Sequence, residues 1–476
     1  MKRFATWCAA AALAAPLVAQ EPTADERLRA LERQNQEILE RLRASEARNQ
    51  ELEGKLGALA EERKAEETEA AVETELNTLN ARLQDSVNWK QLTKSGNPIR
   101  FYGFLRTDAY YSTGRFNDPH LPQWVLREGD GTGGTVLSND DEFTYDVRLT
   151  RFAFDLNAGK AAGAELTGKL ETDFANTPVK SVATSGSPVT SVREVRDESR
   201  HTPRIRLAYL NADFGDVAIR VGQDWDTIAP LNPAVNAETL LWNAGNLGDR
   251  RPMATFMWDG GDAAETSFQL KISAGLTSAV DAADIDANGQ KDGWDAGHPH
   301  LQARFGVATP GWVDKKMINA GAWAYWARSE ADTNVYDGDN HAHGWAFGYD
   351  VVLPIIDCLS FRSEGFVGQA LADVRGGIAQ SFNGAGDEIS TWGGWAELEF
   401  RCDELTLSVG VSIDNPDNDD LAAGGRDKNW TMYLGAKYDL GGGWMVGADA
   451  IYWETQYLAL GIGNALRFDV YTMLSF

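Results

Sequence analysis

One acidic segment of the chain has the residue types and spacing of a calcium-binding loop. Its pattern is DxDxNGxxDxxD, in which Gly289 provides the turn and the following residues provide oxygen ligands: Asp284, Asp286, Asn288, Asp292 and Asp295. Carboxylates suit a hard cation, and such residues converge because the backbone wraps around the ion. The last position is Asp rather than the longer Glu of the helix-flanked version. The segment therefore predicts either a calcium site or an acidic solvated loop.

A second group of candidate residues is basic and alternates with apolar residues along short segments. In a strand with lipid on one side and water on the other, successive side chains face opposite sides. Ile205, Leu207 and Tyr209 therefore predict an outward face, which leaves Arg204 and Arg206 on the inner face. The same reasoning on four other segments completes a predicted pore-lining set: Arg100, Arg106, Arg204, Arg206, Arg220, Lys271 and Arg304.

These basic residues favour the passage of anions, but wall arginines can also balance nearby carboxylates. Asp108, Glu171 and Asp224 are candidates for such balancing. The sequence thus leaves selective anion passage and unspecific polar diffusion as two alternatives. Arg148 and Arg151 have opposite parity, so a bulge is needed if both are to face inward.

The segment from Leu231 to Arg251 differs from the other polar connections because it carries apolar residues at Leu240, Leu241 and Trp242. A connection of this composition could fold into the pore as a constriction. Four of its charged residues would then stand against the basic wall: Glu238, Asp249, Arg250 and Arg251. Opposite charges facing each other across a pore produce a transverse field that orients small polar or charged solutes.

The elements that must position these residues are short alternating segments that continue to the terminal Phe476. From Ile99 onward we expect about sixteen strands, in which tight turns alternate strictly with long polar connections. No later segment approaches the roughly twenty consecutive apolar residues of a membrane-spanning helix. The fold class predicted for residues 98–476 is an all-β transmembrane barrel of about 16 antiparallel strands in an outer membrane.

The N-terminal part predicts two further segments. Lys2 and Arg3 precede an apolar stretch, which indicates a signal peptide at residues 1–19. Residues 24–86 predict an α-helical coiled coil in the periplasm, with Leu28, Leu42 and Leu56 among the heptad a positions and Asn35 and Asn49 fixing a parallel register. A solvated single helix or a disordered spacer is the alternative.

Two cysteines of the predicted mature chain, Cys358 and Cys402, fall in predicted periplasmic turns at the ends of neighbouring strands. Neighbouring strand ends bring Cα atoms close enough for a disulfide, and the periplasm is oxidising. We therefore expect a bridge, with two free thiols as the alternative.

Charge and motif content exclude some classes of function. A net charge of −26 would repel nucleic acid. A barrel hydrolase would need a nucleophile activated by a base. The histidine pairs His298/His300 and His341/His343 are better explained as hydrogen-bonded residues at strand ends. We expect no enzymatic activity.

Several stretches resemble the DcaP-like outer-membrane porins: IRFYGFLRTDAYY from Ile99, RVGQDWDTIAP from Arg220 and NLGDRRP from Asn246. The resemblance covers essentially the whole chain. It implies trimers of sixteen-stranded barrels with periplasmic coiled coils that take up small anions, notably dicarboxylates. The positions that match the family pattern lie around the third long connection: Gly222, Gln223, Gly248, Arg250, Arg251 and Pro252.

Together these features predict a homotrimeric porin of the bacterial outer membrane for passive diffusion of small hydrophilic, anionic solutes. Its expected partners are outer-membrane lipid, lipopolysaccharide and the solutes, with no nucleic acid. Structural calcium is the sole cofactor considered. The alternatives are a structural tether between the outer membrane and the cell wall and, with less support, a barrel hydrolase.

Overall fold

The computed structural model describes residues 45, 48, 99–129, 136, 138–176, 201–236 and 239–476. The chain divides into two units, Met1–Asn88 and Trp89–Phe476. In the first unit Ser45 and Arg48 are helical. The remainder of the predicted signal peptide and coiled coil lies outside the described residues, so both stay predictions. No helix within the described part is long and apolar enough to span a membrane.

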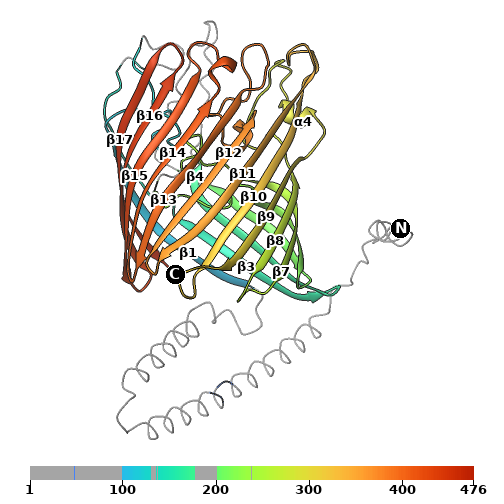
Figure 1. Ribbon diagram of the computed structural model, residues 1–476, viewed down its shortest axis with the longest axis vertical. Helices are drawn as coiled ribbons and strands as arrows, with labels where there is room; N and C mark the ends of the chain where they lie inside the picture. Colours follow the sequence, from blue (N-terminus) through green and yellow to red (C-terminus); the bar gives the residue numbers. More distant parts are fainter. Residues whose placement is uncertain are drawn as a thin grey trace, which may run out of the picture. The chain divides into compact units, whose positions relative to one another are not determined.

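The second unit is built from antiparallel strands (Figure 1). The first half contains β1 Ile99–Ser112, β2 Glu142–Asp146, β3 Arg151–Ala161, β4 Ala164–Asn176, β5 Thr202–Asp213, β6 Val217–Trp225, β7 Arg250–Gly261, β8 Ser267–Gly275 and β9 His300–Pro310. The second half contains β10 Met317–Glu330, β11 His341–Ile356, β12 Leu359–Gln369, β13 Ser390–Cys402, β14 Leu405–Pro416, β15 Arg426–Gly441, β16 Trp444–Tyr457 and β17 Gly461–Ser475. The short helices are α4 Asp292–Asp295, η1 Ala372–Val374 and η2 Asn418–Asp420.

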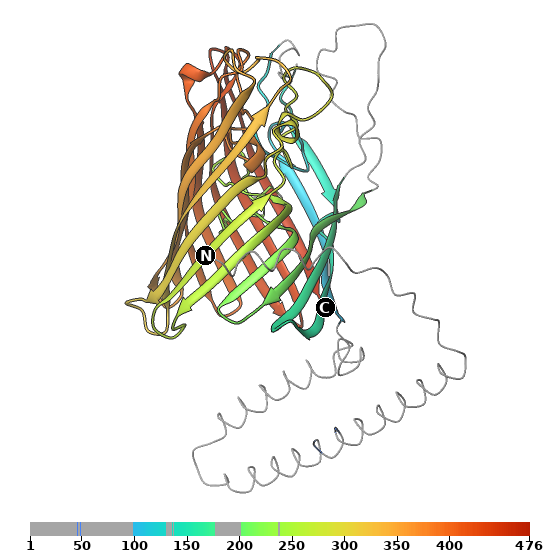
Figure 2. The ribbon, with the colours of Figure 1, turned by 90° about the vertical axis from the view of Figure 1, so that its right-hand side faces the viewer.

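The sheet closes on itself because β1 pairs with β17, with Phe104 opposite Ser475 (Figure 2). Both β2 and β3 pair with β1 and follow one another in the chain, so they form one interrupted strand. The seventeen strand segments therefore make a closed barrel of sixteen strands. Closure gives each strand of the ring a neighbour on both sides, as a β-structure surrounded by lipid requires. The expected β-barrel fold is confirmed.

The interruption between β2 and β3 explains how two arginines of opposite parity both avoid the outer face. Arg148 lies in the gap, is fully buried and donates from Nε to Asp146 (2.9 Å). Arg151 begins β3 and lies 3.4 Å from Glu171. The local break in pairing thus has the effect of the bulge that the sequence required.

Alternation separates an apolar outer face from a polar inner face. On β17, Phe468, Val470 and Leu474 are exposed, whereas Arg467 and Asp469 are buried. Strand β5 departs from the predicted parity, because register shifts between Leu207 and Ile205 and leaves Arg206 as the extra residue of a bulge.

The predicted outward positions of Leu207 and Tyr209 are wrong because of the β5 bulge. Leu207 is buried and Leu210 is 69% exposed on the outside, so the outward parity passes to Leu210. The ring of Tyr209 lies 4.2 Å from the Arg220 guanidinium. Arg204 and Arg206 nevertheless face inward, as predicted. Arg206 is the extra residue of the bulge, and the alternation on its N-terminal side places Ile205 outside and Arg204 inside.

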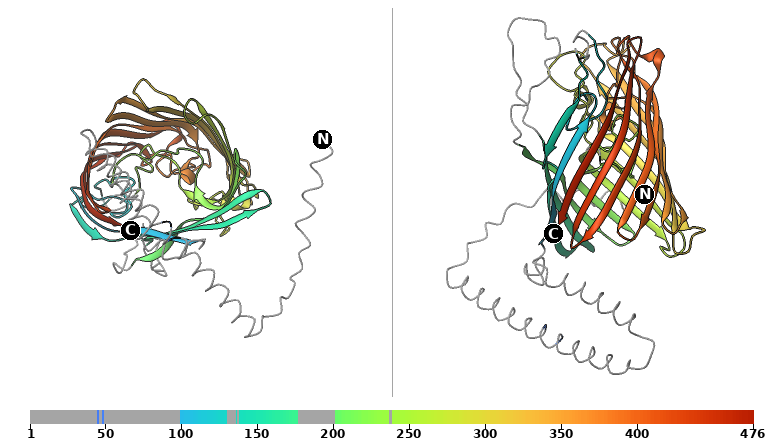
Figure 3. Two further views of the ribbon diagram at one scale, coloured as in Figure 1. Left: turned by 90° about the horizontal axis from the view of Figure 1, so that it is seen from below. Right: turned by 90° about the vertical axis from the view of Figure 1, so that its left-hand side faces the viewer.

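Tight turns and long connections alternate along the barrel as predicted, with one exception. The connection from Tyr457 to Gly461 lies at the same end of the barrel as the long connections, but it is short. Seen from below, the strands form a ring and connecting segments cross its interior (Figure 3). The buried apolar clusters combine these segments with inward-facing wall residues, for example Leu241 with Tyr433 and Trp453. The core of this protein therefore lies inside the barrel.

Candidate functional site in the barrel lumen

The connection between β6 and β7, residues 226–249, folds into the lumen and reaches the opposite wall. The N–H of Leu231 donates to Glu364 on β12 (2.7 Å), and the N–H of Ala234 donates to Glu397 on β13 (2.8 Å). Asn236 accepts from Arg106 on β1. This connection, called the third loop below, is thus anchored at several points around the ring and narrows the pore.

The tip of the third loop lies directly against the wall at Gly245. Its φ of +113° belongs to the region that favours glycine. A Cβ atom here would meet the carbonyl oxygen of Gly394 and the backbone nitrogen of Ile413. A side chain at this position would force the loop away from β13 and β14.

Two other connections enter the lumen and were not predicted to do so. The connection between β12 and β13, residues 370–389, buries Leu371, Val374 and Ile378. The first long connection places the N–H of Val125 on Thr455 (2.9 Å). The sequence feature that could have indicated this inward folding is the few apolar residues that both connections carry among Gly, Asn and Asp. Among the described residues, these two connections therefore share the lumen with the third loop.

The predicted basic residues lie on the inner wall of β1 and β5 to β9, most of them paired with carboxylates. Arg204 and Arg206 bind Asp173 at 2.9 Å each, and Arg206 also binds Glu171 at 2.7 Å. The remaining contacts are Arg106 with Asp108 (2.6 Å), Arg220 with Asp224 (2.6 Å) and Arg304 with Asp350 (2.6 Å). Lys271 lies beside Arg304 in the register of β8 and β9. Arg100 is exposed near the start of β1.

Arg250 differs from these residues because part of its guanidinium is unsatisfied. It lies 4.6 Å from the ring of Trp225 and 5.9 Å from the ring of Trp242. Its nearest carboxylate contact is Asp249 at 3.5 Å, and its Nη1 is buried without a hydrogen-bond partner among the described residues. Arg206 lies over the same Trp225 ring at 5.9 Å. Arg250 is thus a buried cation beside another cation.

Arg251 does not take the predicted place at a constriction. Arg251 belongs to β7, is fully buried and binds Asp226 (2.8 Å) and Asp373 (2.7 Å). It therefore fixes the third loop to residues 370–389 rather than facing a solute path. Arg250 also belongs to β7 and not to the loop. Glu238 lies outside the described residues.

Asp249, the remaining charged residue of the predicted constriction, joins two lumenal connections. Arg375 reaches it from residues 370–389 with a 2.6 Å contact. Burial would raise the pKa of Asp249, but Arg375 and Arg250 hold that pKa below its ordinary value. Arg375 also lies 4.5 Å from the ring of Trp242. The carboxylate is therefore an ionised anchor between the third loop and its neighbour.

Carboxylates dominate the opposite wall, and they bind loop backbone instead of arginine alone. Glu364 and Glu397 accept from the third loop, as described above. Asp414 on β14 accepts from the N–H of Ile378 (3.2 Å) and from the hydroxyl of Thr391 (2.7 Å). The wall carboxylates on β12 to β14 therefore fix the inward-folded connections in place.

The predicted calcium loop brings three of its residues together. Carboxylate oxygens of Asp284, Asp286 and Asp292 lie within 4.8 Å of one another. Gly289 has a φ of +91°, which agrees with its predicted turn. Asn288 and Asp295 instead contact each other, with a 3.1 Å bond from Nδ2 of Asn288. Burial raises the pKa of Asp292, whose carboxylate also accepts from Tyr336.

Cys358 lies in the turn just before β12, and Cys402 is the last residue of β13. Cys358 and Cys402 form a disulfide, with Cα atoms 5.2 Å apart. The N–H of Arg401 also donates to the carbonyl oxygen of Cys358 (2.7 Å). The bridge thus joins two turns at the end of the barrel opposite the long connections.

The barrel is similar to solved structures of outer-membrane proteins. The outer-membrane channel DcaP of Acinetobacter baumannii matches with a TM-score of 0.59 and 16% identity, over 79% of this chain and 97% of that chain. This chain has the fold of that channel. The resemblance predicted from the sequence is thereby confirmed at the level of fold. No family model and no curated protein sequence matches the chain.

Two other outer-membrane proteins show weaker structural similarity. The trimer form of OmpT from Vibrio cholerae matches with a TM-score of 0.47 and 13% identity, over 79% of this chain and 99% of that chain. The anion-selective porin from Comamonas acidovorans also has a TM-score of 0.47, with 10% identity over 79% of this chain and 99% of that chain.

Proposed function

We propose that the protein is a porin of the bacterial outer membrane through which small hydrophilic solutes diffuse passively, with anions favoured. The apolar outer face and polar interior suit a barrel in lipid. The observation that carries the anion preference is the imbalance around Arg250. Among the described residues, contacts within 4.0 Å join three carboxylates, Glu171, Asp173 and Asp249, to five arginines: Arg151, Arg204, Arg206, Arg250 and Arg375.

The imbalance matters because a lumen has a lower effective dielectric constant than bulk water. A unit charge about 4 Å from an ion contributes about 1 kcal/mol in water and about 4 kcal/mol near a protein surface. Excess guanidinium charge therefore attracts an anion and repels a cation at the narrowed part of the pore. A dicarboxylate could bridge two such groups through paired hydrogen bonds.

A planar bilayer measurement tests this proposal directly. The protein is reconstituted in an asymmetric KCl gradient, and the reversal potential is recorded. We expect a reversal toward the chloride potential and stepwise closures in threes, as for a homotrimer. A reversal toward the potassium potential would refute the anion preference, and no conductance would refute the porin proposal. In that case peptidoglycan binding and a hydrolase assay would test the tether and enzyme alternatives.

We further propose a structural calcium ion at the connection between β8 and β9. The supporting observation is the convergence of Asp284, Asp286 and Asp292. Two of these carboxylates are partly exposed and adjacent, so their mutual repulsion would be relieved by a divalent cation. Such an ion would stiffen the connection without entering the solute path.

A further inference from the structure

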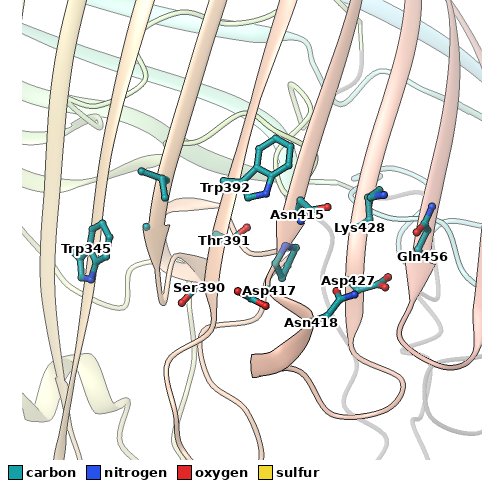
Figure 4. A pocket seen from close by; sticks show the side chains of 13 residues that line it. Trp345, Ser390, Thr391, Trp392, Asn415, Asp417, Asn418, Asp427, Lys428 and Gln456 are labelled. Atoms are coloured by element: carbon teal, nitrogen blue, oxygen red, sulfur yellow. The ribbon is translucent and has the colours of Figure 1, made fainter.

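A polar recess lies on the outside of the barrel near the long connections. It has a volume of about 610 Å³ and is lined by residues from β11 to β16 (Figure 4). The pairing register aligns Val367 with Trp392 and Trp392 with Asn415, and it pairs Lys428 with Gln456. The recess is therefore a band that crosses neighbouring strands at one level.

The side chains of this band face away from the lumen. Val367 and Trp392 are each 51% exposed, and inward-facing neighbours such as Thr391 and Asp414 are buried. Asn415, Lys428 and Gln456 share the outward parity, and Asp417, Asn418 and Asp427 complete the rim. Polar side chains in hydrocarbon are costly, so this band belongs at the level of polar headgroups.

An apolar groove continues from the recess toward the middle of the barrel wall. It has a volume of about 710 Å³ and shares Val367 and Trp392 with the recess. Gly365 and Gly394 pair with each other and place no side chain on its floor. The other main lining residues are Phe347, Tyr349, Ala396, Val411, Ile413 and Trp430. A polar site thus opens directly onto an apolar trough.

We infer that the recess and groove together bind a phosphorylated glycolipid of the outer leaflet, with its saccharide in the recess and an acyl chain in the groove. An amphiphile in this leaflet has the required orientation, because its headgroup lies toward the long connections. The carboxylates of Asp417 and Asp427 accept hydrogen bonds from sugar hydroxyls, and the amides in the lining both donate and accept them. The exposed Trp392 offers an apolar face to a sugar ring. Lys428, which lines the recess together with those carboxylates, is the cation that would bind a phosphate.

The width of the band favours a saccharide over the headgroup of a glycerophospholipid. From Val367 on β12 to Gln456 on β16 the band crosses four gaps between strands, which is about 19 Å at ~4.8 Å each. A headgroup of several sugar rings can contact this length, whereas a single phosphodiester headgroup contacts only part of it. An ordinary aromatic girdle would explain Trp392 and Trp430 but not the polar row beside them.

Native mass spectrometry of the full-length protein in detergent tests the inference. The probes are rough lipopolysaccharide, which carries a phosphorylated saccharide and acyl chains, and phosphatidylethanolamine. We expect one lipopolysaccharide retained per chain and at least tenfold weaker retention of phosphatidylethanolamine. Trp392→Ala and Ala396→Leu should each weaken lipopolysaccharide retention at least tenfold, the first by removing a headgroup contact and the second by filling the groove.

Two matched variants control for general effects of exposed substitutions. Trp312 is 65% exposed in the turn between β9 and β10, and Ala322 is exposed on β10, outside both sites. Trp312→Ala and Ala322→Leu should retain lipopolysaccharide like the unmodified protein. Equal retention of both lipids, or equal losses in test and control variants, would overturn the inference in favour of a general lipid belt.

A second copy of the chain is the rival occupant of the groove. If Ala396→Leu lowers the oligomer mass and leaves lipopolysaccharide retention unchanged, the groove is a contact between copies and the inference is wrong. Bilayer conductance is recorded for the same variants. Because no substituted residue faces the lumen, conductance is expected to be unchanged, so failure of glycolipid binding is distinguishable from failure of the porin proposal.

Discussion

Two walls of the lumen carry opposite charges and use them differently. Within the described part of the wall of β3 to β7, arginines outnumber the carboxylates that they contact, and Arg250 keeps a buried nitrogen without a described partner. On the wall of β12 to β14, Glu364, Glu397 and Asp414 each accept a hydrogen bond from the backbone of an inward-folded connection.

The difference shows that charge alone does not identify a solute-binding wall. A buried backbone N–H needs an acceptor, and a carboxylate supplies a strong one. The carboxylates of the acidic wall therefore mainly bind the backbone of the inward-folded connections, whereas the basic wall has a guanidinium that can still bind a mobile anion. Opposite charges do face each other across the lumen, but the acidic side is the wall of β12 to β14 and not the third loop, from which the sequence predicted the transverse field.

The largest expected effect comes from removing an anchor of the acidic wall. Glu397 accepts from the N–H of Ala234 and the hydroxyl of Tyr433 (2.8 Å each) and also binds Arg362. Glu397→Ala removes the acceptor of the Ala234 N–H and of the Tyr433 hydroxyl and leaves Arg362 with its 3.5 Å contact to the Glu399 carboxylate. A buried donor without an acceptor costs about 1–3 kcal/mol. We expect a lower unfolding temperature and a larger, noisier single-channel conductance as the third loop detaches.

Glu399→Ala is the matched control for that change. Glu399 lies on the same strand and contacts Arg401 (3.0 Å) and Arg362 (3.5 Å), with no hydrogen bond to the third loop. Its conductance should equal that of the unmodified protein. If both variants change conductance alike, the acidic wall does not anchor the loop through Glu397.

A smaller but more specific effect is expected on the basic wall. Arg250→Met removes the charge and keeps a long side chain between Trp225 and Trp242. From the Coulomb range of about 1–4 kcal/mol for a nearby unit charge, reduced by screening, we expect the chloride-to-potassium permeability ratio to fall about three- to tenfold. The reversal potential measures this ratio.

Arg100→Met removes the same charge at the exposed start of β1. Bulk water screens that position, so its permeability ratio should change by less than about twofold. A change as large as that of Arg250→Met would mean that overall lumen charge, rather than the Arg250 cluster, sets selectivity.

In the acidic loop near Asp284 we expect the carboxylates to be neutralised by a calcium ion. This differs from the two walls, where arginine side chains or backbone N–H groups bind the carboxylates. Calcium at about ten times its dissociation constant should stabilise the protein by roughly 1.4 kcal/mol. Thermal unfolding with calcium or chelator measures this effect. Asp284→Asn should abolish it, while Asp314→Asn, in a turn at the other end, should leave it intact. Equal calcium responses in both variants would contradict the proposed site.

The smallest effect at neutral pH is expected at the junction of the two walls. The pKa of Asp249 lies below the ordinary value of 3.8, so its ion pair with Arg375 stabilises the fold above that pH. This contribution is lost as the pH falls through the lowered pKa, which places the change below about pH 4. Channel noise should therefore rise only under strongly acidic conditions.

Asp249→Asn separates this junction from other acid-sensitive groups. The variant should already show the increased noise at pH 7 and should gain less from acidification than the unmodified protein. If its acid-induced change is as large as that of the unmodified protein, other carboxylates control the response.

Local alternation allowed much of the barrel to be predicted from the sequence, because each outward position in lipid must be apolar. This rule correctly placed Arg220 and Lys271 inside and the apolar residues of β17 outside. It failed at Leu207 and Tyr209, since a bulge changes parity through pairing with β4, which β5 alone does not encode. The rule also cannot show that Arg251 links two connections, because this role depends on Asp226 and Asp373, which lie elsewhere in the chain.

The sequence by itself determined a closed β-barrel, its inward basic residues, the neighbouring positions of the cysteines and the apolar character of the third loop. Those features depend on alternation and spacing along one segment. Only the tertiary structure decided that the connections described above enter the lumen, which carboxylates hold them and that the guanidinium of Arg250 remains incompletely paired. Those features depend on contacts between residues that are distant in the chain. The carboxylates of β12 to β14 bind backbone N–H groups of the connections, whereas the arginines of β3 to β7 bind a smaller number of carboxylates.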